Sequence, residues 1–198
     1  MVRPRADNYE ERRQEILDAA AAIFAEQGFD GTSIADIARR CGGSKALLYH
    51  YYQSKEALLF DMLHSHCRLL VETATKALTK NGHPEGQLQQ LVRALMQLYM
   101  SSRDKHVVLL NDLHCLPVDK QKQIRDLERR VLEVIKDLLA KLRPDLPVPV
   151  LTSLTMYLMG AINWTYTWFK PHGSMSANQY ADLATTTFLN GLHGTLPA

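Results

Sequence analysis

One stretch of the sequence, residues 32–55 (TSIADIARRCGGSKALLYHYYQSK), restricts the fold more than any other. Ser33 followed by Asp36 has the spacing of a helix-capping box, and apolar residues then recur at helical spacing. Gly42 lies in a glycine pair that suits a sharp turn, because glycine readily adopts a left-handed backbone. Ser44 is suited to cap a second helix. Two short helices joined by a turn with glycine are the helix-turn-helix pattern.

The second of these helices, expected over residues 44–52, has a face that suits a polyanion. We orient it with Leu48 toward the core and advance about 100° per residue. The outward residues are then Lys45, Ala46, Leu47, Tyr49 and His50. None of them is acidic, whereas a solvated helix face normally carries Asp or Glu. Ala46 would permit close approach to DNA, and Leu47 could contact a thymine methyl group.

These residues resemble the DNA-binding signature of the tetracycline-repressor (TetR) family of bacterial regulators. The matching positions are Thr32, Ser33, Ile37, Ala38, Gly42, Ser44, Lys45, Leu48, Tyr49, His50, Tyr51, Tyr52, Ser54, Lys55 and Glu56. The resemblance covers roughly the first third of the chain. It implies a three-helix head, of which residues 9–27 are the expected first helix, and it implies binding to double-stranded operator DNA.

Four residues depart from the family pattern. Gly43 replaces the usual Val, which we expect to remove a core contact and loosen the turn. Ala46 and Leu47 replace the common Gly and Thr, so the base preference cannot be transferred. Tyr52 replaces the usual Phe, and its hydroxyl needs a hydrogen-bond partner or water.

We divide the candidate DNA contacts by chemistry. Base edges are assigned to Lys45, Leu47 and His50. Phosphates are assigned to Thr32, Ser44, Tyr49, Tyr52 and Lys55. Although the net charge of the whole chain is only +2, residues 32–55 contain four cations against one acid.

The rest of the chain also has helical periodicity, so we expect an all-α protein of 198 residues in two domains. Residues 1–53 would form the DNA-binding domain, with residues 1–8 as a flexible arm. Residues 54–198 would form a helical domain for effector binding and dimerisation. Further helices are expected at 54–78, 87–101, 105–116 and 119–142, the last with Asp119 as its N-cap. We find no repeat and no strand pattern.

The uncharged run 150–169 is long enough to be considered as a membrane span. It contains several Ser, Thr and Asn residues and has no basic flank, so we expect a packed helix and no membrane partner. The three cysteines are odd in number and widely spaced, and we see no signal peptide. We therefore expect reduced thiols and a cytoplasmic protein.

Two glycines, Gly160 and Gly191, lie on the last two apolar helices. A glycine permits close approach between helices, which suits a dimer interface. The family resemblance implies the same arrangement, a four-helix bundle formed by two subunits.

No arrangement of residues indicates catalysis, so we expect no enzyme activity, catalytic residue, metal or cofactor. His64, His66 and Cys67 are a poor metal site because helical positions two apart diverge by about 200°. We interpret this cluster as part of a solvated helix face.

Polar and aromatic side chains on the later apolar helices make candidates for a ligand pocket, which is usually apolar with a few converging polar groups. The candidates are Tyr99, Arg103, Asn111, His114, Tyr157, Asn163, Trp164 and Trp168. Packing in the core or at a dimer interface explains the aromatic residues equally well. Residues 110–113 and 163–165 faintly resemble a branch of the family that senses acyl-CoA thioesters. Cations for such a ligand would be Arg93, Arg103 and Lys105.

The sequence therefore predicts a homodimeric repressor that binds a pseudo-palindromic operator and is released by a small apolar or aromatic effector, with an acyl-CoA thioester as one candidate. Recognition helices would enter successive major grooves about 34–36 Å apart. The helix that begins at Ser54 would transmit ligand binding to the head. An activator or architectural DNA-binding protein without an effector is the alternative. An enzyme or carrier without salt-sensitive DNA binding is a third class.

Overall fold

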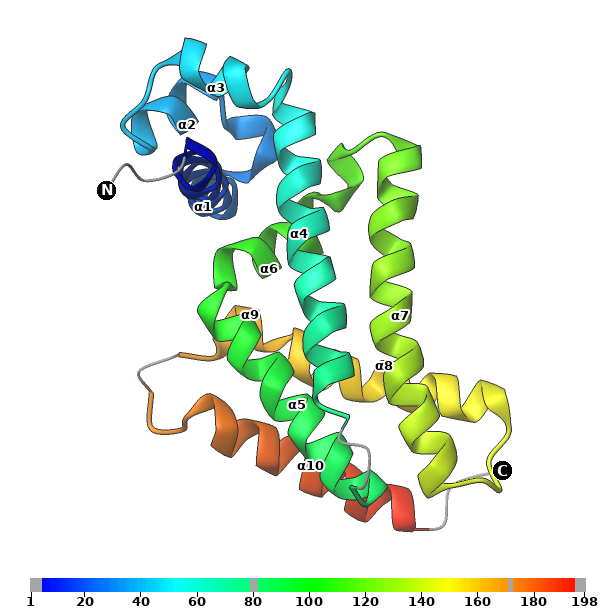
Figure 1. Ribbon diagram of the computed structural model, residues 1–198. Coiled ribbons are helices and arrows are strands. Elements are labelled where there is room, and N and C mark those ends of the chain that lie inside the picture. The colour runs from blue at the N-terminus through cyan, green and yellow to red at the C-terminus, as the bar shows by residue number, and fades with distance from the viewer. Residues whose placement is uncertain (1–4, 79–81, 171–172, 195–198) are drawn as a thin grey trace. The chain divides into compact units, whose positions relative to one another are not determined.

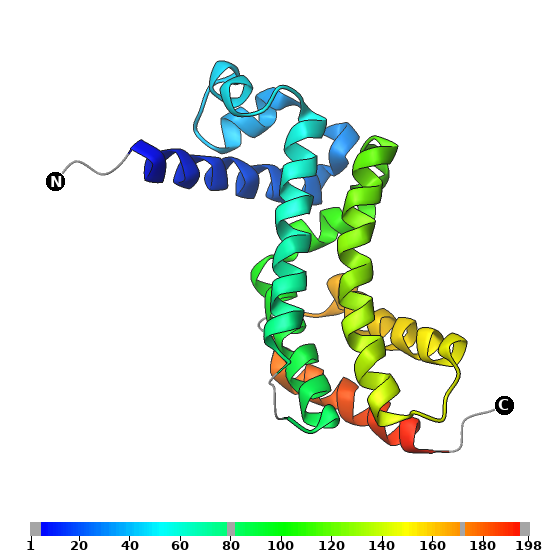
Figure 2. The same ribbon diagram turned by 45° about the vertical axis from the view of Figure 1, so that its right-hand side comes forward.

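The computed structural model describes residues 5–78, 82–170 and 173–194, and in these ranges the chain forms helices and no β-strand. Figures 1 and 2 show the helices from two directions. In chain order they are α1 (Arg5–Gly31), α2 (Ile34–Arg40), α3 (Lys45–Tyr51), α4 (Lys55–Lys76), α5 (Pro84–Ser101), α6 (Arg103–Asp112), the 3₁₀ segment η1 (Leu113–Cys115), α7 (Val118–Leu142), α8 (Val148–Asn163), α9 (Thr165–Trp168) and α10 (Ala177–His193). The all-α prediction is confirmed.

The chain divides into two compact units. The first comprises Met1–His66 and Asp104–Ile124, and the second comprises Cys67–Arg103 and Arg125–Ala198. Helices α4 and α7 each contribute residues to both units. These units do not coincide with the expected domains, residues 1–53 and 54–198. The domain boundary at 53/54 therefore stays a prediction.

The core of the first unit is built on one face of α1, where Ile16, Leu17, Ala20 and Phe24 are buried. Helix α2 packs against α1, and α3 packs against α2. The expected end of the first helix at residue 27 is followed by a kink, because Gly28 has a φ of 75° and interrupts the helical backbone. Of the expected flexible arm, residues 1–4 lie outside the described ranges, and residues 5–8 belong to α1.

In the second unit, α10 packs against α5 and α8. The buried face of α5 repeats at helical spacing: Leu88, Leu91, Val92, Leu95, Met96 and Tyr99. A polar contact joins α5 and α10, because the Asp182 carboxylate accepts hydrogen bonds from Gln89 and, through both oxygens, from Arg93. Arg93 therefore has a structural partner and is a poor candidate for a ligand phosphate.

Two details of the later helices differ from the sequence-based expectation. Helix α7 begins at Val118, so Asp119 lies in its first turn and is not its N-cap. The uncharged run 150–169 is not one helix, since it divides at Trp164 into α8 and α9. No helix in the described ranges combines the length and apolar character that crossing a membrane requires.

Candidate nucleic-acid interface and effector residues

The helix-turn-helix geometry is confirmed by its caps. The Ser33 hydroxyl oxygen accepts from the amide of Asp36 at 3.3 Å, and the Asp36 carboxylate accepts from the amide of Ser33 at 3.1 Å. Gly42 has a φ of 64°, which only glycine adopts at low cost. The Ser44 hydroxyl then accepts from the amide of Leu47 at 3.2 Å and caps α3.

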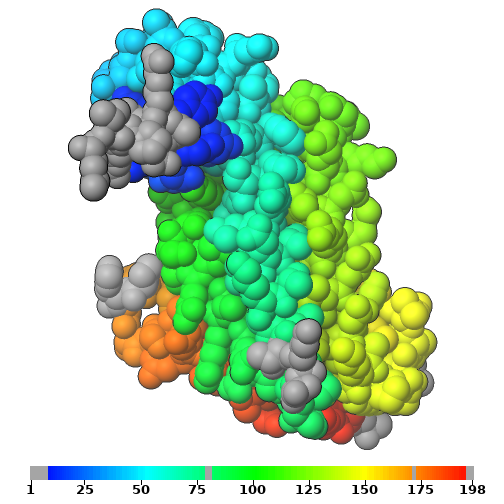
Figure 3. Space-filling view, in the orientation of Figure 1, coloured from blue at the N-terminus to red at the C-terminus, as the bar shows by residue number. Residues whose placement is uncertain are grey.

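The outward face of α3 is as expected except at Leu47, which is half-buried. Within α3 the buried residue is Leu48, while Lys45, Ala46, Tyr49 and His50 are exposed. Tyr49 leaves 55% of its surface accessible, so its hydroxyl is available to a ligand. The atoms of residues 34–51 form part of the molecular surface in Figure 3. This face offers one cation, a phenol and an imidazole to a polyanion.

Side chains of neighbouring residues fill the space beside Gly43, where the family usually has Val. A Cβ at this position would lie 2.8 Å from Leu47 Cδ2 and 3.2 Å from Arg12 Nη2. Arg12 reaches across from α1 and donates to the carbonyl of Cys41 at 3.0 Å. Two side chains therefore occupy the space that a larger residue at position 43 would need, and the expected loosening of the turn stays a prediction. Leu47 is half-buried here, unlike its outward neighbours.

Three of the predicted phosphate contacts have partners inside the protein. Thr32 is buried and its hydroxyl donates to the carbonyl of Gly28 at 2.8 Å. Lys55 Nζ donates to the carbonyls of Phe29 and Thr32 at 2.7 and 2.9 Å and lies 4.0 Å from the Phe29 ring centroid. Tyr52 is buried, and its hydroxyl donates to Asp61. Because these groups are engaged, we do not retain them as DNA contacts.

One exposed cation at the end of α2 was not among the predicted contacts. The Arg39 side chain is 78% exposed and makes a loose ion pair with Asp36 at 3.3 Å. Its neighbour Arg40 is held by both oxygens of Glu26, each at 2.7 Å. Arg39 is therefore an additional candidate for a phosphate contact. The signal in the sequence was its place in the last turn before Gly42.

Two predicted effector residues are brought together in the second unit. Tyr99 is buried and donates to the side-chain oxygen of Asn163 at 2.9 Å. Burial, above all, raises the pKa of the Tyr99 hydroxyl, which therefore stays protonated. Arg103, also in this unit, is exposed and donates to the carbonyl of Tyr166 at 2.9 Å.

Other predicted effector residues are exposed. Asn111 and His114 are exposed and lie in the first unit, whereas Tyr99, Arg103 and Asn163 lie in the second. The exposed fractions of Tyr157, Trp164 and Trp168 are 68%, 62% and 51%. The surface position of these three aromatic residues favours interface packing, the alternative that the sequence left open.

A buried histidine pair was missed. His66 of α4 and His106 of α6 are both buried in the first unit, with ring centroids 5.7 Å apart. Neither ring nitrogen of His66 has a hydrogen-bond partner among the described residues. Burial lowers the pKa of His66 to about 4 and that of His106 to about 3. The solvated-face interpretation is therefore wrong for His66 and for the buried Cys67 beside it. The described ranges contain no cluster of three or more metal-ligating side chains.

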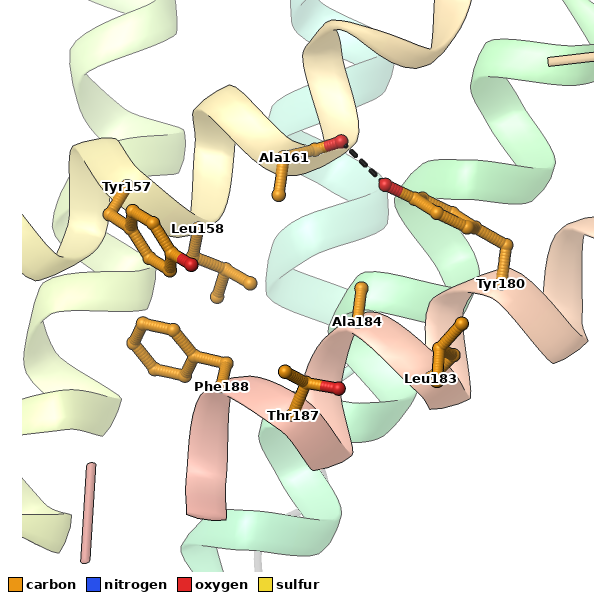
Figure 4. A pocket seen from close by; sticks show the side chains of 8 residues that line it. All are labelled: Tyr157, Leu158, Ala161, Tyr180, Leu183, Ala184, Thr187 and Phe188. Carbon is orange, nitrogen blue, oxygen red and sulfur yellow. Dashed lines mark hydrogen bonds between the residues drawn. The ribbon is translucent and has the colours of Figure 1, made fainter. Parts of the chain in front are cut away.

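Helices α8 and α10 border a pocket of about 150 Å³ (Figure 4). Its lining is mainly apolar and aromatic: Tyr157, Leu158, Ala161, Tyr180, Leu183, Ala184, Thr187 and Phe188. At one side the Tyr180 hydroxyl donates to the carbonyl of Ala161 at 2.9 Å.

Gly160 and Gly191, the two predicted contact glycines, are exposed, and an added Cβ at either would meet no atom within 4 Å.

The capped helix pair and its exposed, acid-free recognition face define a helix-turn-helix DNA-binding protein. Residues 16–62 match the bacterial regulatory proteins of the tetR family, and residues 81–192 match the tetracyclin repressor-like C-terminal domain. The chain belongs to the TetR family of transcriptional regulators and is not an enzyme.

Several relatives span nearly the whole chain. A TetR-family regulator from Bordetella parapertussis 12822 is 41% identical, with a TM-score of 0.87 over 94% of this chain and 98% of that one. The transcriptional repressor KstR2 of Mycolicibacterium smegmatis is 29% identical over 91% of this chain and 90% of its own. AibR, solved in complex with isovaleryl coenzyme A and operator DNA, is 26% identical, with a TM-score of 0.78 over 89% of this chain and 97% of that one.

Proposed function

We propose that this regulator is a repressor that binds a pseudo-palindromic operator as a homodimer and is released by a small acyl-CoA effector. The observation that carries the DNA-binding part is the outward face of α3, where Lys45, Tyr49 and His50 are exposed and no acid competes with phosphate. Ser44 and Arg39 add polar groups beside this face. Leu47, being half-buried, would make at most an edge contact with a thymine methyl.

The homodimer is supported by the surface of α8, α9 and α10. Tyr157, Trp164 and Trp168 are exposed on helices that lack charged residues over most of their length. Large exposed aromatic side chains on uncharged helices favour an interaction surface. A second copy of the chain would cover them and set two recognition helices about 34–36 Å apart, one DNA turn.

The effector part rests on the relatives. AibR binds isovaleryl coenzyme A, and KstR2 of Mycobacterium tuberculosis is described as a ketosteroid transcriptional regulator. In this chain, the Tyr99–Asn163 hydrogen bond provides a polar group at the buried face of α5. Arg103 is exposed and is the best placed of the three candidate cations, because Lys105 is ion-paired with Asp18 at 2.6 Å and Arg93 with Asp182.

The test begins with selection of duplexes from a randomised DNA library by the purified protein. We expect an inverted repeat with half-site centres 10–10.5 base pairs apart and two chains bound per duplex. Straight-chain, branched and aromatic acyl-CoA thioesters are then added to the complex, each beside its free acid. We expect one thioester class to lower operator affinity 5- to 150-fold. Selection of an inverted repeat with no release by any thioester would favour the alternative, a DNA-binding protein without this effector.

A further inference from the structure

The recognition helix α3 is held by few contacts. It has seven residues, and helices shorter than about 12 residues are marginal in isolation. Leu48 is its buried residue, and the Tyr51 ring stacks on Tyr9 of α1 with the ring centroids 4.7 Å apart. With so few packing contacts, its direction also depends on its two ends, which are Ser44 at the N-cap and Tyr52 at the C-cap.

The C-terminal end of α3 is linked to α1 and α4 by hydrogen bonds to one carboxylate, that of Asp61. The Tyr52 hydroxyl donates to Asp61 Oδ2 of α4 at 2.6 Å. The same carboxylate accepts from Arg13 of α1, with Nε at 3.0 Å from Oδ2 and Nη2 at 2.5 and 2.6 Å from Oδ1 and Oδ2. Tyr52 is buried, and the side chains of Arg13 and Asp61 are each about three-quarters buried. Hydrogen bonds to a charged group in such surroundings are short and strong.

The Tyr52 hydroxyl distinguishes this chain from the usual family pattern. At this position the TetR pattern usually has Phe, whose ring would fill the same space. A buried hydroxyl without a partner is unfavourable, so Tyr here requires an acceptor. Burial and then the bond to Asp61 raise the pKa of Tyr52, so the phenol stays protonated and remains a donor at all physiological pH values.

We propose that Asp61 is a positioning residue for operator recognition, and that it acts by holding Tyr52 and Arg13 so that α3 keeps a fixed direction on α1 and α4. This inference rests on the operator binding proposed above. Contacts to base edges demand accurate placement of side chains, whereas attraction to phosphates tolerates small displacements. Removal of the Tyr52–Asp61 hydrogen bond should therefore weaken sequence-specific binding far more than non-specific binding.

Tyr52→Phe is the decisive variant, because it keeps the ring and leaves the Arg13–Asp61 pair intact. Its affinity is measured for the duplex selected by the wild-type protein and for a scrambled duplex at the same salt concentration. We expect about a tenfold loss of affinity for the selected duplex, the size of a loosened base contact, and less than a twofold change for the scrambled one. A role in stability alone would lower the melting temperature and leave this ratio unchanged once the protein is folded.

The variant Asp61→Asn and its control distinguish a change in the position of α3 from the effect of removing a negative charge. Removal of an acid should by itself strengthen DNA binding, as Glu56→Gln, at an exposed acid of α4 in the same unit, should demonstrate. We expect Asp61→Asn to weaken specific binding in spite of this. In the double variant with Tyr52→Phe, the fall in affinity should not exceed the larger of the two single effects, because both act through one hydrogen bond.

The outcomes separate this inference from the function on which it depends. If the wild-type protein selects no sequence, operator binding itself is overturned. If it selects one but Tyr52→Phe binds with an unchanged ratio of specific to scrambled affinity, the positioning role of Asp61 is overturned while operator binding stands.

Discussion

At the scale of single residues, the recognition helix separates contacts that read bases from contacts that bind phosphate. Tyr49→Phe removes one exposed hydroxyl from α3. If that hydroxyl binds phosphate, affinity for the selected and the scrambled duplex should fall together. Lys45→Ala or His50→Ala should instead reduce the preference for the selected duplex, by about 1–3 kcal/mol for each side chain that reads a base.

The measurement is a set of fluorescence-anisotropy titrations at several salt concentrations. Lys122→Ala, at an exposed lysine of α7 outside the helix pair, controls for the removal of one positive charge. An unchanged affinity of Tyr49→Phe at every salt concentration would refute the phosphate assignment.

The buried histidines make a prediction about pH. The folded pKa values of about 4 for His66 and about 3 for His106 lie below the unfolded value of 6.5, so the folded state binds fewer protons. Their contribution to stability is complete above pH 6.5 and is lost as the pH falls toward 4. Each histidine should lower the free energy of unfolding by about 1.4 kcal/mol per pH unit within that window.

Urea denaturation at pH 7.5, 6.0 and 5.0 checks this. His66→Leu should reduce the decrease in stability between pH 6.0 and 5.0, because it removes one group that is protonated on unfolding. His114→Gln, at an exposed histidine of the same unit, is the control for the removal of a histidine. Equal slopes for His66→Leu and the wild-type protein would show that His66 is already protonated in the folded state.

At the scale of helices, local signals in the sequence were reliable and long-range ones were not. The capping box at Ser33, the turn at Gly42 and the cap at Ser44 depend on residues at most three or four positions apart, and the structure confirms each. The engagement of Lys55 with the carbonyls of Phe29 and Thr32 depends on tertiary packing, which no local pattern reveals. The same applies to the His66–His106 pair, whose members are forty residues apart.

The glycine on α10 makes a prediction about assembly. A Cβ at Gly191 would meet no atom within 4 Å, so a side chain fits on a single chain and should not unfold it. If a second copy packs here, Gly191→Leu should block it and give a folded monomer with weakened operator binding. Gly86→Leu, at an exposed glycine of α5 with equally open surroundings, is the matched control.

Sedimentation velocity and circular dichroism are the measurements. We expect a helical monomer for Gly191→Leu and a dimer for both Gly86→Leu and the wild-type protein. A stable dimer of Gly191→Leu that binds the selected duplex normally would place the interface on another surface.

At the scale of the whole molecule, the proposed repressor couples two binding events, and linkage fixes how they must relate. An effector that lowers operator affinity by some factor must itself bind the DNA-bound protein more weakly by the same factor. Calorimetric titration of the active thioester into the free protein and into its complex with the selected duplex should therefore give two dissociation constants whose ratio equals the factor by which operator affinity falls.

Arg103 tests what part of the effector the protein contacts. If its guanidinium binds the CoA phosphates, Arg103→Ala should weaken thioester binding by about tenfold, as expected when one charge-assisted hydrogen bond is removed, and leave operator affinity without effector unchanged. Lys141→Ala, at an exposed cation of α7 in the same unit, should weaken neither. Equal affinity of the thioester for free and DNA-bound protein would refute the effector assignment however tightly the compound binds, because a ligand that does not distinguish two states cannot shift the balance between them.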